Sequence, residues 1–210
     1  MYVNFEKLPQ EKKDKILNAA INEFCKESYS SASTNNIINE AGISKGALFN
    51  YFGSKKNLYL YLVDYLKDYY VKYMINKMKI NSTDIFQRII DWEELKASIA
   101  FENPSIRNFF AYAFVNVPEK LKVEIGIRYK KLHELGYKLT TEGIDLSKFR
   151  DDIDKVKAVE LIVMTLDGLT QKRVAAYKSM EGSGYDPKDI DRANEEFKDY
   201  IVVLRKVFYK

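Results

Sequence analysis

The amino-acid sequence predicts an all-α fold. Apolar residues recur at helical spacing along almost the whole chain of 210 residues, and no convincing run of alternating apolar and polar residues, which would indicate a strand, is present. The chain contains only nine glycines and four prolines. Its length allows a small module joined to a larger one. We therefore expect a short N-terminal domain of three helices over residues 1–54 and a larger helical domain over 80–210.

Turn and capping residues set the bounds of the first two predicted helices. Over residues 11–26 the apolar side chains share one face, and the lysines and acids fill the other side. A shorter helix is predicted over 34–40, with Ser33 as its N-cap. Gly42 follows at a position where a helix ends in the left-handed conformation, which glycine adopts without steric strain.

The later helices are bounded in the same way. Ser44 is expected to cap a third helix that runs through Tyr51. Gly53 and Ser54 end that helix and cap a long connecting helix over 55–79. Asparagine, glycine and proline residues mark the bounds of five further helices, expected over 84–102, 104–116, 118–142, 150–180 and 187–209.

The excess positive charge lies in the N-terminal third of the chain. Residues 1–80 contain twelve lysines and eight acidic residues, whereas the other 130 residues carry equal numbers of basic and acidic groups. A basic module beside a neutral one indicates that the first part binds a polyanion. Chance scatter of lysines over solvated helix faces is the alternative explanation.

Residues 33–41 and 44–51 have the pattern of a helix-turn-helix unit, with a glycine at its corner. The second helix of such a unit fits the major groove of DNA, and its N-terminal residues reach the base edges. Leu48 and Phe52, four residues apart, should pack inward. The other side chains of this helix then face outward or along the rim, namely those of Lys45, Ala47, Phe49, Asn50 and Tyr51.

The same segment carries a resemblance to a known family. The residues concerned are Ala32-Ser33-Thr34 and Ile37 in the second helix, Ala41 to Gly46 across the turn, and then Leu48, Tyr51-Phe52, Ser54-Lys55 and Leu58. On these positions, residues 10–60 resemble the DNA-binding domain of the TetR family of bacterial transcriptional regulators. The resemblance implies a repressor that binds a near-palindromic operator as a homodimer. A small, mainly apolar effector bound by the C-terminal helices would then release the DNA.

The resemblance also implies which residues meet DNA. The expected contacts are Ser33, Thr34, Ser44, Lys45, Gly46, Ala47, Asn50, Tyr51 and Lys55. The two lysines and Tyr51 are expected at phosphates, with solvated lysines and packing of the tyrosine against the first helix as the alternatives. Asn50 either reads an adenine or stays in water. Glycine at position 46 either allows a close approach to DNA or is simply tolerated in a short helix.

The sequence departs from the family's pattern at four positions. Asn36 stands where the family more often has an acid, and Ile38 where it often has alanine. Ala47 replaces a common threonine and Phe49 a common tyrosine, which removes two hydroxyls that could contact phosphate. The bound base sequence therefore stays open.

Two helices of the C-terminal part are apolar on more than one side, which is typical of a helix that is central to a core or shared with another chain. We expect the helices over 150–180 and 187–209 to form a four-helix interface between two subunits. The residues assigned to this interface are Val159, Val163, Leu166, Phe197, Ile201, Leu204 and Phe208.

An effector pocket is expected among the aromatic and sulfur-containing residues, although most of these are also suited to an ordinary core. Glu160 and Asp167 interrupt apolar stretches, and a buried carboxylate needs a partner, either a cationic ligand or, more commonly, a lysine or a helix N-terminus. The pocket residues predicted on this basis are Tyr73, Phe101, Phe110, Phe114, Tyr129, Met164 and Asp167.

Other classes of function fit less well. The chain has a single cysteine, Cys25, and a single histidine, His133, so we expect no catalytic dyad, no metal site and no cofactor. No stretch is apolar enough to span a membrane, and the charged N-terminus is unlike a signal peptide, which predicts a cytoplasmic protein. The rival interpretation is a helical protein-interaction adaptor, which would not explain the basic helix-turn-helix.

Overall fold

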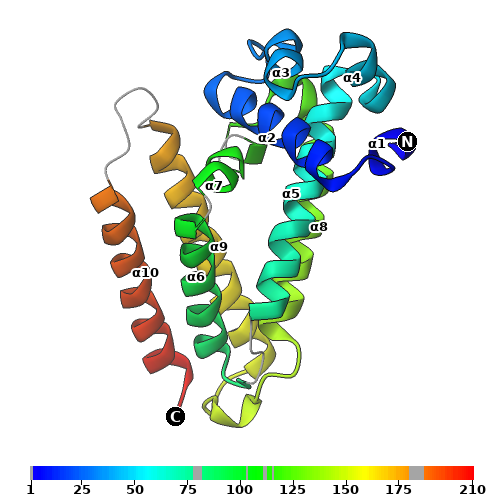
Figure 1. Cartoon of the computed structure of the whole chain (residues 1–210). Helices are drawn as coiled ribbons and strands as arrows, with labels where there is room; N and C mark the ends of the chain where they lie inside the picture. The colour runs from blue at the N-terminus through cyan, green and yellow to red at the C-terminus, as the bar shows by residue number, and fades with distance from the viewer. Residues whose placement is uncertain (1, 78–81, 103, 111–112, 115, 180–186) are drawn as a thin grey trace. The chain divides into compact units, whose positions relative to one another are not determined.

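The computed structural model describes residues 2–77, 82–102, 104–110, 113–114, 116–179 and 187–210. Within these ranges the chain is helical and contains no β-strand, which confirms the all-α fold class (Figure 1). By packing, the residues form two compact units, one of residues 1–77 and 96–130 and one of 78–95 and 131–210. Residues 96–130 therefore pack with the N-terminal helices, and the domain boundaries expected near 54 and 80 stay a prediction.

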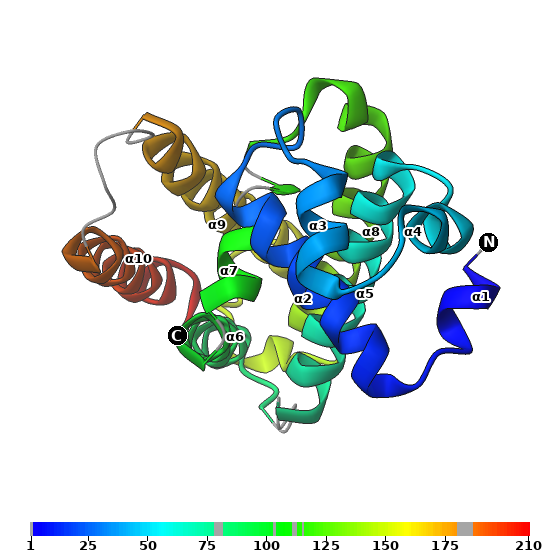
Figure 2. The ribbon, with the colours of Figure 1, turned by 45° about the horizontal axis from the view of Figure 1, so that its top comes forward.

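The first unit holds the helix-turn-helix. Its helices α1 to α4 gather around the first turns of α5 (Figures 1 and 2). Two helices, α6 and α8, contribute residues to both units. The bounds in the first unit are α1 (Val3–Glu6), α2 (Gln10–Lys26), α3 (Thr34–Ala41), α4 (Lys45–Phe52), α5 (Lys55–Lys77), α7 (Pro104–Phe110) and the 3-10 helix η2 (Glu119–Leu121). The shared helices are α6 (Ile85–Glu102) and α8 (Lys122–Thr141).

The ends of the helices confirm most of the predicted capping residues. Gly42 has a φ of 65° and ends α3. Its N–H donates to the Asn39 carbonyl and that of Ile43 to the Ile38 carbonyl, the Schellman pattern of a helix end. At the start of α5, the Ser54 hydroxyl oxygen accepts from the Asn57 N–H at 3.1 Å. The end of α3 and the start of α5 are therefore set by residues that the sequence indicated.

One buried cluster joins the helices of the first unit. It includes Ile16 and Ala20 of α2, Ile37 of α3, Leu48 of α4 and Leu58 of α5, all of them less than 3% exposed. Burial of this apolar surface, rather than the propensity of such short helices, holds α3 and α4 in place. The recognition elements are thus part of a continuous core.

The second unit is built on α9 (Lys155–Ser179) and α10 (Pro187–Phe208). Their buried side chains pack with those of α6 around Phe86 and Phe149. The segment between α8 and α9 contains the 3-10 helix η3 (Leu146–Lys148).

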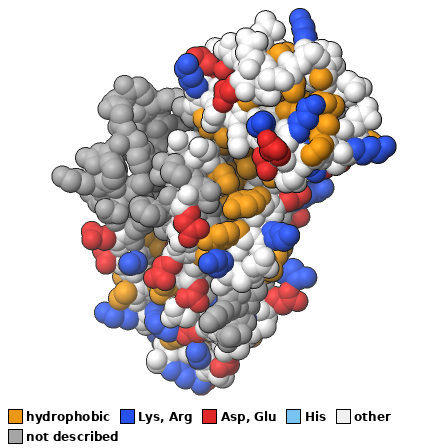
Figure 3. All heavy atoms as spheres, viewed as in Figure 1, with side chains coloured by type: hydrophobic (Ala, Val, Ile, Leu, Met, Phe, Trp, Pro, Cys, Tyr) orange, Lys and Arg blue, Asp and Glu red, His pale blue; other side chains and the backbone are white. Residues whose placement is uncertain are grey.

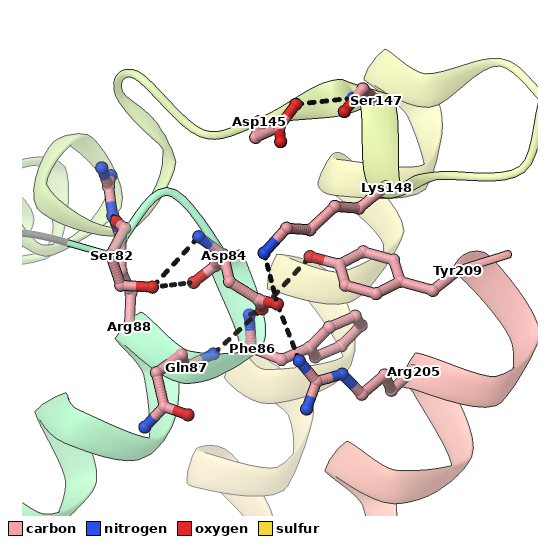
Figure 4. A network of polar contacts seen from close by, with 10 residues as sticks. All are labelled: Ser82, Asp84, Phe86, Gln87, Arg88, Asp145, Ser147, Lys148, Arg205 and Tyr209. Atoms are coloured by element: carbon pink, nitrogen blue, oxygen red, sulfur yellow. Dashed lines mark hydrogen bonds and ion pairs between the residues drawn. The ribbon is translucent and has the colours of Figure 1, made fainter.

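A polar network ties the end of the chain to the start of α6. The Asp84 carboxylate, 6% exposed, caps α6 by accepting from the backbone N–H groups of Phe86 and Gln87. Figure 4 shows Lys148, Arg205 and Tyr209 pointing toward the same carboxylate. The Lys148 ammonium, the Arg205 guanidinium and the Tyr209 hydroxyl donate to it at 3.2, 2.7 and 3.2 Å. Asp84 therefore joins three segments of the second unit.

Some predicted bounds differ from the structure. The helix expected over 150–180 begins at Lys155, because the Asp154 carboxylate accepts from the N–H groups of Val156 and Lys157 and so caps it. The helix expected from 118 begins as 3-10 helix before α8. Of the helix expected over 104–116, residues 104–110 are α7 and residues 113–114 are π-helix, whereas 111, 112 and 115 lie outside the described residues. Helix α1 was not predicted at all. Among the described residues, no helix has the length and apolar character needed to cross a membrane.

Candidate nucleic-acid interface

Helix α4 is the candidate recognition helix. Leu48 and Phe52 are each 2% exposed and pack into the core, as predicted. Lys45, Gly46 and Asn50 are exposed, and Tyr51 is half-buried. The helix therefore presents basic and amide side chains on the side away from the core.

The N-terminus of α4 is capped as the sequence predicts. The Ser44 hydroxyl oxygen accepts from the Ala47 backbone N–H at 3.1 Å. The hydroxyl proton remains available to a phosphate oxygen. A Cβ added at Gly46 would come no closer than 4.0 Å to another atom, that of the Ser44 side chain. The protein itself thus leaves room for a side chain at position 46, and its own packing gives no reason for glycine there.

A buried carboxylate fixes the start of α3. Ser33 has the extended backbone of an N-cap, but its hydroxyl makes no capping hydrogen bond. Instead its N–H donates to the Glu23 carboxylate at 2.6 Å, and the Asn36 amide donates to both oxygens of the same group. Glu23 is only 6% exposed, so it lies on the buried side of α2, where no acid was predicted. An acid at position 36 would bring two carboxylates together, which accounts for asparagine there.

Lys55 holds the loop that precedes α3. Its ammonium donates to the carbonyls of Ser30 and Ala32 at 3.1 and 2.7 Å and lies 5.1 Å from the centre of the Tyr29 ring. Burial lowers the pKa of Lys55, although nearby Glu23 opposes this shift. Lys55 thus has a structural role that the sequence did not indicate, and its expected phosphate contact stays a prediction. Thr34, half-buried in the first turn of α3, is likewise untested as a contact.

Asn50 and Tyr51 both have contacts with α1. The Asn4 amide donates to the Asn50 side-chain oxygen at 3.2 Å. The Tyr51 ring packs edge-on against Phe5 at 6.0 Å between centroids. These contacts were not predicted from the sequence. The aromatic residues Tyr2 and Phe5, which precede the first predicted helix, were the feature that could have indicated packing of this segment.

Ion pairs among the described residues balance part of the positive charge of the N-terminal third. Lys13 pairs with Glu6 at 3.6 Å, and Lys56 pairs with Glu124. On the described part of the face in Figure 3, basic and acidic side chains are interspersed. Lys45 is exposed at the first position of α4, where a positive charge can contact a phosphate.

The residues assigned to a dimer interface lie mostly inside the second unit. Val159, Phe197 and Ile201 are 7%, 5% and 3% exposed and belong to its core. Leu166, Leu204 and Phe208 pack against that core, and Val163 is half-buried. Three of the seven side chains are thus buried in the single subunit and four are half-buried, and their role in a dimer interface stays a prediction.

The same two helices expose other apolar residues. On α9 they are Val156, Leu161 and Met164, which are 62%, 52% and 67% exposed. On α10, one stripe contains Tyr200, Val203 and Val207. Helix α9 thus has apolar side chains on two sides, as the sequence indicated, and Leu161 and Met164 lie on the exposed side, away from Val159 and Leu166.

The expected pocket residues divide between the two units. In the first unit, Phe110 stacks on Phe114 at 5.7 Å, and Phe114 lies 6.1 Å from Tyr129. The Tyr73 hydroxyl donates to Glu102 at 2.7 Å. Phe101 belongs to α6, but its side chain lies outside the described part of the chain.

In the second unit, neither acidic residue on α9 is buried. Glu160 is exposed, and the Asp167 side chain is 48% exposed and lies 3.0 Å from the ring of His133. Met164 is 67% exposed. The cationic-ligand interpretation required a buried carboxylate, so its premise is wrong.

Cys25 lacks the properties of a nucleophile. Burial raises the pKa of its thiol to about 11, and the thiol donates to the Ser105 carbonyl at 3.6 Å. A reactive cysteine requires the opposite shift, toward the thiolate.

Comparison with known proteins identifies the N-terminal unit. Residues 16–62 match the family described as bacterial regulatory proteins, tetR family. The biofilm operon icaADBC HTH-type negative transcriptional regulator IcaR of Staphylococcus aureus (strain Newman) is 28% identical, over 94% of this chain and 99% of its own length. The uncharacterized HTH-type transcriptional regulator YerO of Bacillus subtilis (strain 168) is 26% identical, over 81% of this chain and 56% of its own length.

Solved structures agree on the fold. A putative tetR family transcription regulator from Shewanella sp. PV-4 has a TM-score of 0.63 at 18% identity, over 95% of this chain and 98% of the other. The fatty acid degradation regulator FadR from Bacillus halodurans has a TM-score of 0.63 at 20% identity, over 91% of this chain and 97% of the other. Residues 16–62, which include the helix-turn-helix built by α3 and α4, thus match the tetR family of bacterial regulatory proteins, and the chain is similar to a transcriptional regulator over nearly its whole length.

Proposed function

We propose that this protein is a repressor that binds a near-palindromic DNA operator as a homodimer and is released by a small, mainly apolar effector. The observation that carries the proposal is the exposed face of α4, with Lys45, Gly46 and Asn50 directed away from a fully packed core. An α-helix with this face fits the major groove, where an amide and an ammonium can contact bases and phosphates. The protein would act in the cytoplasm, where its operator lies.

The direction of regulation is supported by a relative. IcaR is named a negative regulator of an operon, and it is similar to this chain over nearly the full length of both. Repression requires no more than occupancy of DNA that the transcription machinery needs.

A homodimer is supported by the exposed apolar side of α9 and α10. Val156, Leu161 and Met164 on α9 and Tyr200 and Val203 on α10 are large apolar side chains that the single subunit leaves exposed, and exposed apolar patches commonly mark interaction sites. Gly168 lies on the same side of α9, and a Cβ there would meet nothing within 4 Å, so another helix can approach closely. We therefore propose that these exposed residues form the interface together with the half-buried Val163, Leu166, Leu204 and Phe208. Two recognition helices would then be about one DNA turn apart, roughly 34 to 36 Å.

Release by an effector rests on the family and on the aromatic residues around Phe110. An effector displaces the operator only if it binds the DNA-free conformation more tightly than the DNA-bound one. We propose that an apolar effector contacts the row of rings from Tyr70 through Phe110 and Phe114 to Tyr129.

The experiment that tests the function is selection of fragments of the organism's own genome by the purified protein, followed by sequencing. We expect a few fragments that share a near-palindromic motif and whose affinity falls steeply as salt concentration rises. A protein-interaction adaptor would select no DNA fragments that share a sequence motif. Equal retention of all fragments would contradict sequence-specific regulation.

A further inference from the structure

Helix α1 packs on the recognition helix. Phe5 is fully buried, and its ring lies 4.8 Å from that of Phe52, 5.2 Å from that of Tyr61 and 6.0 Å from that of Tyr51. Figure 2 shows α1 beside α4. These aromatic contacts therefore hold α1 against α4, and the exposed face of α4 stays available to DNA.

Polar contacts hold α1 at both ends. The Tyr2 hydroxyl donates to the Asn57 carbonyl at 3.3 Å. The Tyr61 hydroxyl donates to the Glu6 carboxylate at 2.6 Å. A helix of four residues does not persist by its own hydrogen bonds, so these contacts with α5 and the burial of Phe5 keep it folded.

This placement brings Asn4 to Asn50. Both side chains are exposed, and the Asn4 amide nitrogen donates to Asn50 Oδ1 at 3.2 Å. The bond engages one lone pair of Oδ1 and restricts rotation of the Asn50 side chain. The other lone pair and both N–H groups of Asn50 remain available, and these are the groups with which asparagine binds N6 and N7 of adenine together.

We propose that Asn4 is a positioning residue that orients Asn50 for base reading and so helps to set the base preference of the regulator. The proposal rests on the proposed function, because it requires that α4 enters the major groove. Orientation before binding matters because an unrestrained side chain loses rotamer freedom on ordering, and that loss opposes binding. In the groove, where water is displaced, the Asn4–Asn50 bond is also stronger than in bulk solvent.

The test uses the full chain and the operator that the wild-type protein selects. Affinity is measured for every single-base-pair variant of that operator with the wild type, Asn4→Ala, Asn50→Ala and the double variant. Val3→Ala is the matched control, since Val3 is an exposed neighbour on the same helix, at 58% exposure. Thermal unfolding is followed for all five proteins.

We expect Asn4→Ala to reduce the preference at the base pair read by Asn50 by about threefold to tenfold, the range of one net hydrogen bond. The other positions, the melting temperature and the Val3→Ala control should stay as in the wild type. The double variant should lose no more preference than Asn50→Ala alone, because Asn4 acts through Asn50.

Unchanged preference in Asn4→Ala would overturn the proposal, and so would additive losses in the double variant, which would indicate that Asn4 contacts DNA independently. A uniform loss across all positions together with a lower melting temperature would reveal a structural role only and would also overturn it. In each of these cases the wild type still has an operator, so the proposed function stands. If the wild type selects no sequence, both proposals fail.

Discussion

Single carboxylates determine much of the local geometry of this protein. Asp84 caps α6 and also accepts from Lys148, Arg205 and Tyr209 (Figure 4). Burial alone would raise the pKa of Asp84, but the Gln87 N–H and the two cationic side chains stabilise the carboxylate and hold its pKa below the ordinary value of 3.8. The charged form is therefore the one that the folded protein favours.

Replacement of Asp84 by asparagine should lower the free energy of unfolding at pH 7 by about 2 kcal/mol, because two charge-assisted hydrogen bonds are lost. Since the pKa is lowered in the folded state, this stabilisation is present above the unfolded pKa, about 3.9, and is lost as the pH falls through the folded value. The difference between wild type and Asp84→Asn should thus be constant from pH 7 to 5 and shrink below pH 4, as measured by denaturant unfolding. Asp199→Asn, on the exposed surface of α10, is the control and should change little. A difference that persists undiminished at the lowest pH would contradict this role of the charge.

Some residue roles could be predicted from the sequence and others could not. Ser44 and Gly42 were predictable because a hydroxyl N-cap and a left-handed glycine act within a few residues of the chain. Glu23 acts on residues ten and thirteen positions later, through the packing of α2 against α3. Glu23 lies three residues after Ala20 and therefore on the apolar face of α2. This spacing was the sequence feature that indicated a buried carboxylate in need of a partner.

At the scale of single elements, α4 combines a stabilising cap with a residue that weakens it. A glycine in a helix costs about 0.5 to 1 kcal/mol relative to alanine, and nothing within the protein prevents a Cβ at position 46. A close approach of DNA to the backbone of the first turn, as the proposed function requires, would be a physical reason for glycine, and tolerance of glycine in a short helix is the alternative.

Gly46→Ala should therefore raise the melting temperature slightly while weakening operator binding by about tenfold, equivalent to ~1.4 kcal/mol. The control is Gly126→Ala on α8, where a Cβ also meets nothing within 4 Å. The control should gain stability and keep its affinity. Thermal unfolding and mobility shift on the selected operator measure the two effects. Full operator affinity in Gly46→Ala would mean that the glycine is merely tolerated.

Helices with strong periodicity were predicted well, whereas α1 was missed. The segments around α2 to α5 have both an apolar face and local end signals, and the described bounds of α2 to α4 and the start of α5 agree with the prediction within two residues. Helix α1 has only four residues and depends on rings of α4 and α5 that lie about fifty residues later in the chain. No local pattern contains that information.

At the scale of the whole molecule, α9 and α10 illustrate a limit of periodicity. The sequence indicated two apolar sides on α9, but periodicity alone does not tell which side meets the subunit's own core and which meets a partner. The structure assigns Val159 and Leu166 to the core and leaves Val156, Leu161 and Met164 exposed. The proposed dimer interface therefore includes these three exposed residues.

Met164→Glu should raise the dissociation constant of the dimer by at least about tenfold, because a charge would be buried there without a partner. Val123→Glu is the matched control, since Val123 is 73% exposed on α8 and outside the proposed interface. Sedimentation equilibrium of both variants measures the effect. A Met164→Glu protein that remains as dimeric as the control would exclude this surface as the interface.

The most direct test of α4 as the reading helix is operator affinity over a salt series for Lys45→Ala, compared with Lys72→Ala. Both lysines are exposed on helices of the same unit, but Lys72 lies more than four turns along α5. We expect Lys45→Ala to bind at least about tenfold more weakly and to lower the salt dependence by about one counterion per subunit, while Lys72→Ala behaves as the wild type. Equal affinity and equal salt slope for the two variants would contradict a DNA-facing α4.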